Sequence, residues 1–182
     1  MNTDNTSISG ETFDYGPCAF MNTYHPDTVF SSIDYNGRYA FGNQPLIIKW
    51  NIARFAEALL PVIHPEKEES IKLAQNALDA FDKIWNEKYY DTMLNKIGIE
   101  SNNSEQYPLV DELLEIMKRL KMDYTNTFLA LSQEISTENS PIHSTDFKSW
   151  LEKWKYVIGN SNGMHEAKQL MNRNNPVFIP RN

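Results

Sequence analysis

The sequence has little of what marks secreted, membrane-spanning or disulfide-stabilised proteins. Its 182 residues include one cysteine, Cys18, so no internal disulfide can form and the fold does not depend on an oxidising compartment. No stretch approaches the ~20 apolar residues of a membrane span, and the first residues lack the basic and apolar regions of a signal peptide. We therefore expect a cytoplasmic protein with no membrane partner.

Positive charge is also scarce. Lysine and arginine total 17 against 24 aspartate and glutamate residues, which gives a formal net charge of -7. Nucleic-acid binding relies on clustered lysine and arginine to neutralise phosphates, and the sequence contains no such cluster. We therefore expect no nucleic-acid partner. With 41% hydrophobic residues, the chain can nevertheless bury a sizeable core.

The character of the chain changes near residue 45. Residues 1–44 are rich in Asn, Asp, Ser and Gly, and the polar and apolar residues on either side of Gly10 predict a short β-hairpin with its turn there. Farther on, apolar residues recur at spacings of three and four. This periodicity predicts helices over about 45–60, 66–96, 110–120, 124–135, 146–156 and 165–173. We expect a mainly α fold, with loops over 1–44 and a helical bundle over 45–182.

One pair of polar segments has residue types suited to metal and phosphate chemistry. Asn2-Thr3-Asp4-Asn5 is followed, nine residues after Asn5, by Asp14-Tyr15-Gly16-Pro17. In kinase-like enzymes an Asn and a following Asp-aromatic-Gly hold Mg²⁺ against the phosphates of ATP, and the predicted hairpin would turn both side chains toward one cation. The spacing alone is equally typical of turns that satisfy only their own backbone.

A longer match extends this pattern. The run MNTDNTSISGETFDYGPCAFM resembles the signature of the selenoprotein O family of protein adenylyltransferases, also called the YdiU family. The resemblance is dense through YNGRYAFGNQP at 35–45 and the pair Trp50-Asn51, and it reappears at Asp123-Tyr124-Thr125 and Asn175-Pro176. It therefore covers the whole chain, most densely over the first 60 residues.

The resemblance implies a kinase-like protein, a pseudokinase by sequence, that transfers AMP from ATP to Ser, Thr or Tyr hydroxyls of other proteins. By position in the family motif, Asp4 is the proton acceptor, Asn5 a metal ligand, and Asp14 a metal ligand that also contacts nucleotide. The cofactor would be Mg²⁺ or Mn²⁺, with ATP as substrate. The fold would be part of a kinase-like carboxy-terminal lobe, opened by the hairpin, in a single partial domain over 1–182.

The resemblance also implies a missing partner. The family's Gly-rich loop, its lysine with a glutamate partner and its phosphate-contacting arginines precede the matching region, so none is assigned here. We expect the chain to need this amino-terminal lobe and to be inactive alone. Two other readings are a non-catalytic helical remnant or protein-binding module, and a small-molecule phosphotransferase that uses the same Asn and Asp positions.

Several reactive residue types have plainer interpretations. Four histidines lack metal-ligand spacing and are expected to have surface or packing roles: His25, His64, His143 and His165. Cys18 has no basic neighbour to lower the pKa of its thiol, which favours a packed thiol over a nucleophile. For Arg38, two roles stay open, orienting the loops around the site or pairing with an acidic neighbour.

Overall fold

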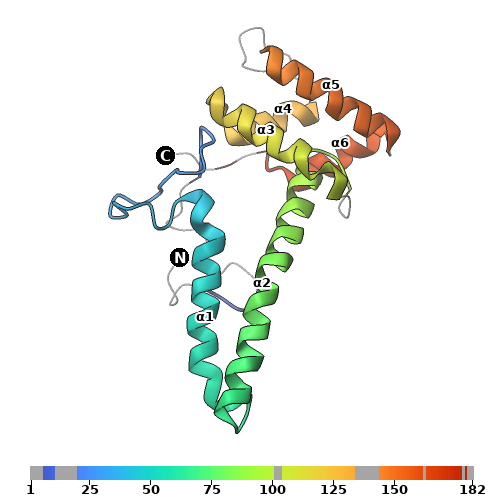
Figure 1. The fold of residues 1–182 in the computed structure, drawn as a ribbon. Helices are drawn as coiled ribbons and strands as arrows, with labels where there is room; N and C mark the ends of the chain where they lie inside the picture. The colour runs from blue at the N-terminus through green and yellow to red at the C-terminus, as the bar shows by residue number, and fades with distance from the viewer. Residues whose placement is uncertain are drawn as a thin grey trace. The chain divides into compact units, whose positions relative to one another are not determined.

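The computed structural model describes residues 6–10, 20–100, 104–133, 144–161, 163–177 and 179. They form two compact units: residues 6–10 with Pro26–Glu87, and Phe20–His25 with the described residues from Lys88 onward. Two short 3₁₀ helices are present, η2 (Phe41–Asn43) and η3 (Ser104–Gln106). The α-helices (Figure 1) are α1 (Gln44–Ile63), α2 (Lys67–Lys96), α3 (Tyr107–Arg119), α4 (Tyr124–Gln133), α5 (Thr145–Asn160) and α6 (Gly163–Asn174).

The helices lie where the apolar periodicity predicts them, with ends that differ by a few residues. α1 begins with Pro45 in its first turn, where a missing N–H costs nothing, and continues through Pro61 to Ile63. α5 begins at Thr145 because the Ser144 side chain accepts a hydrogen bond from the Phe147 N–H, which caps the helix.

The predicted β-hairpin is not present, so the predicted fold class is wrong. Residues 6–10 form bends rather than a strand, and 11–13, its other half, lie outside the described residues. The Ser9 N–H donates to Ser7 Oγ at 3.2 Å, a local bond that competes with strand pairing, and Ile8 is 83% exposed, so this segment buries little apolar surface. Throughout the described ranges the only β-pairing is an isolated antiparallel bridge between Thr23 and Asp123.

In the first unit, a hydrogen-bonded loop leads into α1. The Asp34 carboxylate accepts from the backbone N–H groups of Arg38 and Tyr39, at 2.9 and 2.8 Å. The Gly42 N–H donates to Pro26 O at 2.7 Å, and a side chain at Gly42 would meet Pro26 at 3.2 Å. These contacts fix the chain just before α1 starts.

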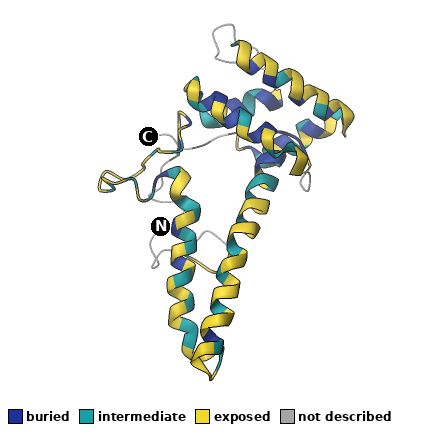
Figure 2. Cartoon of the chain, in the orientation of Figure 1, coloured by how far each residue is buried: buried dark blue, intermediate teal, exposed yellow. Residues whose placement is uncertain are grey.

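The same unit contains the turn from α1 to the first part of α2. Ser70, fully buried, donates its hydroxyl to Leu60 O at 2.6 Å, and Lys49 pairs with Asp82 at 2.6 Å. Many side chains of α1 are exposed or only half-buried (Figure 2). The buried side chains of α1 are Ile47 and Asn51.

The second unit contains most of the buried core. α3 packs against α5, and α6 packs against both α4 and α5; Figure 2 shows the buried residues gathered in these helices. Two buried tryptophans join the elements through their indole N–H groups. Trp150 donates to Leu109 O at 2.8 Å, and Trp154 donates to Ile97 O at 2.7 Å. Each indole therefore satisfies a backbone carbonyl while filling the core.

A short extended segment, residues 20–25, joins the start of α4 in this unit. The Tyr24 N–H donates to Met122 O at 2.9 Å, and the Tyr124 N–H donates to Asn22 O at 2.7 Å. The rings of Tyr24 and Tyr124 stack with their centroids 5.7 Å apart. The chain is thus anchored soon after Asp14-Tyr15-Gly16-Pro17 by backbone bonds and an aromatic stack.

Candidate functional site

The three residues that the sequence assigns to the site, Asp4, Asn5 and Asp14, lie outside the described residues. Their assignment therefore stays a prediction, and the description below concerns described residues close to them in the sequence. Thr6 follows Asn5 directly in the chain and is the first described residue.

Asn51 of α1 contacts Thr6. Its side-chain Nδ2 donates to Thr6 Oγ1 at 3.0 Å, across 45 residues of sequence, and Asn51 is only 4% exposed. Asparagine is a poor helix former, and a buried amide is costly unless it is hydrogen-bonded. A buried asparagine in mid-helix therefore indicates a specific hydrogen-bonding role rather than a packing role.

A cavity lies beside this contact. Its volume is about 610 Å³, and it is lined by Thr6, Ser7 and Ile8 together with Asn51, Ile52, Arg54, Phe55 and Ala58 of α1. Most of the α1 contribution is apolar, and Arg54 supplies a positive charge at its wall. The arrangement suits a group that is partly apolar and partly anionic.

Two arginines lie over the indole ring of Trp50. The guanidinium carbon of Arg38 is 5.1 Å from the ring centroid and that of Arg54 is 5.4 Å from it, both within cation–π range. Arg54 also pairs with Glu57 at 2.6 Å. The described contacts of the Arg38 guanidinium are thus with the Trp50 ring and with the ring of Tyr39. Trp50 and the loop before α1 are tied together by this contact.

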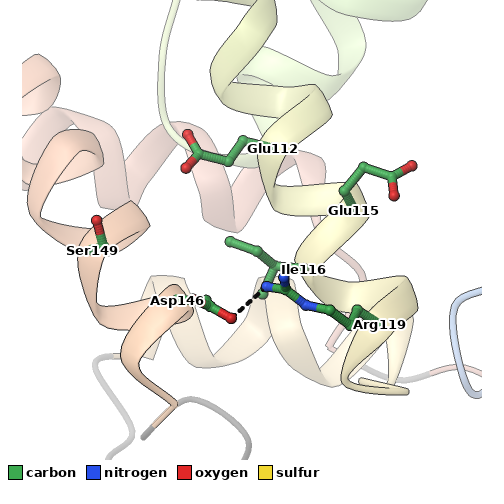
Figure 3. A pocket seen from close by; sticks show the side chains of 6 residues that line it. All are labelled: Glu112, Glu115, Ile116, Arg119, Asp146 and Ser149. Carbon is green, nitrogen blue, oxygen red and sulfur yellow. Dashed lines mark hydrogen bonds and ion pairs between the residues drawn. The ribbon is translucent and has the colours of Figure 1, made fainter.

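A second pocket in the other unit has a different character. It has a volume of about 330 Å³ and is lined by Glu112, Glu115, Ile116, Arg119, Asp146 and Ser149 (Figure 3). Arg119 pairs with Asp146 at 2.6 Å, as the dashed line in Figure 3 marks, and Glu112 pairs with Lys153 at 2.7 Å. Ion pairs this exposed contribute little stability, and they link α3 to α5 at the surface.

A partly buried lysine, Lys96, was not predicted as a residue of interest. Lys96, the last residue of α2, donates to Asn175 Oδ1 at 2.8 Å, and its Nζ lies 4.6 Å from the ring centroid of Phe128 and 5.7 Å from that of Tyr124. Burial lowers the pKa of Lys96 from 10.5 to about 8. Burial also raises the pKa of Tyr124 to about 12, with a smaller contribution from Tyr24.

Among the described residues, no group of three or more His, Cys, Asp and Glu side chains is placed to hold a metal ion. His64 Nδ1 accepts from the Glu66 N–H at 3.1 Å, and His165 Nε2 lies 2.9 Å from Gln169 Nε2. His143 and Cys18 lie outside the described residues. Within the same ranges, no helix is both long enough and apolar enough to cross a bilayer.

Comparison with known proteins tests the resemblance. A family model described as protein adenylyltransferase SelO matches residues 1–182. Proteins named "Protein nucleotidyltransferase YdiU" from Clostridium botulinum (strain Alaska E43 / Type E3), Alkaliphilus metalliredigens (strain QYMF) and Bacillus mycoides (strain KBAB4) are 50%, 48% and 47% identical to it. All of this chain is aligned in each case, against 37%, 37% and 38% of the relatives.

The matches support the family resemblance directly. Identity near one half along the entire chain is far above what a shared fold alone would give, and the family match begins at residue 1 and so includes the Asn-Thr-Asp-Asn and Asp-Tyr-Gly-Pro segments. The chain spans a little over a third of the length of the curated relatives that it matches. The resemblance is confirmed: the chain belongs to the SelO family of protein adenylyltransferases.

Proposed function

We propose that the chain is the carboxy-terminal part of a protein adenylyltransferase that transfers AMP from ATP to Ser, Thr or Tyr hydroxyls of other proteins. The observation that carries the proposal is the family match over residues 1–182, together with relatives named as protein nucleotidyltransferases. A cytoplasmic location fits an ATP-dependent reaction and a chain with one cysteine.

The site residues have chemically consistent roles in this reaction. The hydroxyl oxygen of the target attacks the α-phosphorus of ATP, the bond to the β-phosphate oxygen breaks, and pyrophosphate leaves. Asp4 takes the proton of the attacking hydroxyl, as a general base. The remaining requirement is to position the triphosphate and to offset its charge.

The donor set at Asn5 and Asp14 suits a hard divalent cation such as Mg²⁺ or Mn²⁺. One amide oxygen and one carboxylate oxygen would hold the ion, which usually keeps several waters and binds substrate phosphates as well. When bound, the cation offsets negative charge that develops on the phosphate oxygens. Asp14 would also contact the nucleotide, so its loss is expected to weaken both metal binding and nucleotide binding.

The rest of the longer protein would complete the ATP site. A magnesium ion held by two side chains depends on the substrate phosphates for further ligands, and those phosphates need positive charge and enclosure from elsewhere. We propose that the amino-terminal part of the protein supplies both. A helical module without catalysis is the second candidate, because α1 exposes several large apolar side chains, among them Leu46 and Val62 at 67% and 77% exposure.

The test is the fate of labelled ATP. The chain is produced alone and as a chimera joined to the remainder of the Clostridium botulinum relative, and each is incubated with a mixture of soluble proteins and ATP labelled on either the α- or the γ-phosphate. The proposal predicts that only α-label reaches protein, and only with the chimera. Transfer of γ-label would support a phosphotransferase. If the chimera transfers no label while the intact relative is active, the result would support a non-catalytic module.

A further inference from the structure

One side of α1 is apolar and faces solvent. Ile52, Phe55, Leu59 and Val62 follow one another at spacings of three and four, so they form one stripe along the helix. Ile52, Phe55 and Val62 are 38%, 46% and 77% exposed, and Leu59 is half-buried. Lys49, which pairs with Asp82 of α2, lies on a different side of the helix. We call this stripe the α1 apolar face.

The unit that contains α1 has almost no core of its own. Within its described residues, only two hydrophobic side chains, Ala40 and Ile47, are buried, whereas the remaining buried hydrophobic residues belong to the second unit. A helix gains most of its stability by packing an apolar stripe against another element. The first unit therefore needs a further surface against which α1 can pack.

A hollow adjoins the α1 apolar face. Ile52 and Phe55 of the face line the cavity of about 610 Å³, together with Ile8, which is 83% exposed. A large apolar side chain that enters such a hollow loses its contact with water and anchors the partner that carries it. The face therefore combines protruding side chains with a recess, as packed interfaces between protein elements do.

The charges beside the face favour protein over lipid as its cover. Helices that lie on membranes present free lysine and arginine to anionic lipids. On α1 both basic side chains are paired within the unit, Lys49 with Asp82 and Arg54 with Glu57, each at 2.6 Å. The net charge of -7 also opposes the approach of a second copy of the chain.

The length of the relatives indicates which protein surface is available. The chain spans a little over a third of each curated relative, so most of their length lies outside the match. We propose that the α1 apolar face is the surface on which this other part of the longer protein packs. The inference rests on the proposed function only in taking the chain as part of a longer protein.

The test compares the reactivity of single cysteines in the 182-residue chain and in the chimera with the Clostridium botulinum relative. Cys18→Ser removes the cysteine of the chain, and Phe55→Cys or Val62→Cys then places a thiol on the α1 apolar face. Iodoacetamide is added, and mass spectrometry follows alkylation of the peptide that carries the new thiol. The rate should be at least about 10-fold lower in the chimera, because a covered thiol reacts only when its contact opens.

Lys83→Cys is the matched control. Lys83 lies on α2 in the same unit, its side chain is 81% exposed, and its neighbours in sequence and on the helix include charged residues such as Glu87. Its alkylation rate should differ by no more than about twofold between the two proteins. An equal slowing at Lys83→Cys and at both positions of the face would contradict the proposal, because the protection would then not be specific to the face.

A second variant reports on stability instead of access. Val62→Glu should leave the thermal midpoint of the 182-residue chain unchanged, because substitutions at exposed positions have small effects. The same change should lower the midpoint of the chimera by several degrees, because it buries a carboxylate without a partner. Equal midpoints for the chimera with and without Val62→Glu would count against a buried face.

Three labelling results would overturn the proposal. Rapid alkylation of Phe55→Cys and Val62→Cys in the chimera would leave the face free for a separate protein. Slow alkylation already in the 182-residue chain would mean that the chain covers the face itself. Protection of that chain that increases with its concentration would place a second copy there.

The labelling does not depend on catalysis, so the two proposals can fail separately. A chimera with a protected face that transfers no α-label, beside an active intact relative, would refute the proposed function and support the packing surface. A chimera that transfers α-label while the face remains reactive would refute the packing surface alone.

Discussion

Lys96 allows a prediction about how the stability of the folded chain changes with pH. Its ammonium group is held by Asn175 Oδ1 at 2.8 Å and lies against the rings of Phe128 and Tyr124. Asn175 in turn donates to Lys96 O at 2.8 Å and to Met171 O at 3.0 Å. Partial burial removes water from this amine, so its protonation is less favourable in the folded chain than in the unfolded chain.

The size of the effect follows from the pKa. Burial lowers the pKa of Lys96 from 10.5 to about 8, and each pKa unit corresponds to about 1.4 kcal/mol. The cost of the charged form near pH 7 is thus about 3 kcal/mol at most, because the ring faces and the Asn175 oxygen offset part of it.

Between pH 8 and 10.5 the unfolded chain binds more protons at Lys96 than the folded chain, so stability rises with pH. Stability from this source is complete above pH 10.5 and is lost as pH falls through 8. The gain from pH 7 to 9.5 should be up to about 2 kcal/mol. We do not extend the range above pH 9.5, because burial raises the pKa of Tyr124 to about 12. Above pH 10, ionisation of such a tyrosine in the unfolded chain favours unfolding.

Urea unfolding at several pH values measures this gain. Replacing Trp50 and Trp85 by phenylalanine restricts the fluorescence signal to Trp150 and Trp154, which are buried in the unit that contains Lys96. In this background, Lys96→Met should remove the rise between pH 7 and 9.5. The matched control Lys155→Met, at an exposed position of α5, should keep it. Parallel curves for Lys96→Met and the unsubstituted chain would refute the reasoning.

Three further predictions concern the site and the core. In the chimera, Asp14→Ala should abolish AMP transfer measured with α-labelled ATP, because the proposed metal site would lose its carboxylate ligand, and normal transfer would exclude Asp14 from the site. Asp4→Ala should slow transfer by about 100- to 10,000-fold while calorimetry shows nearly unchanged ATP affinity; a parallel loss of affinity would argue against a general base. Gly98→Ala should destabilise the chain by about 2 kcal/mol in urea unfolding, since Gly98 has φ +78 and an added Cβ would lie 2.9 Å from Ala167 O; unchanged stability would contradict the close approach.

The helices could be predicted from the sequence because their signal is local. In α3, Val110, Leu113 and Met117 repeat at three and four residues, and all three are fully buried. Helix ends were less well predicted, because they depend on single capping contacts such as that of Ser144 with the Phe147 N–H.

The hairpin prediction failed because it also rested on local sequence alone, which is enough for a helix but not for strand pairing. A glycine between polar segments is compatible with a tight turn, but a stable hairpin also needs to bury apolar surface, and Ile8 stays 83% exposed. Ser7 and Ser9 instead bond each other through their hydroxyls at 2.7 Å, a contact whose energy a periodicity argument does not include.

The candidate site residues were assigned only through the family motif, and their assignment stays a prediction. Asp4, Asn5 and Asp14 have common residue types at a common spacing, and the longer match gives them roles. The contact between Asn51 and Thr6 joins residues 45 positions apart, so no local pattern in the sequence indicates it. Lys96 shows the same limit, because its partner Asn175 lies 79 positions farther along.

The most direct test of the central claim is the α-phosphate label in the chimera and in its Asp14→Ala variant, followed on the same protein targets with Mg²⁺ present. If the chain belongs to an adenylyltransferase whose metal is held by Asp14, α-label appears on serine, threonine or tyrosine residues of the targets with the unsubstituted chimera and is absent with the variant. Transfer of γ-label, or equal α-label with Asp14→Ala, would contradict the account.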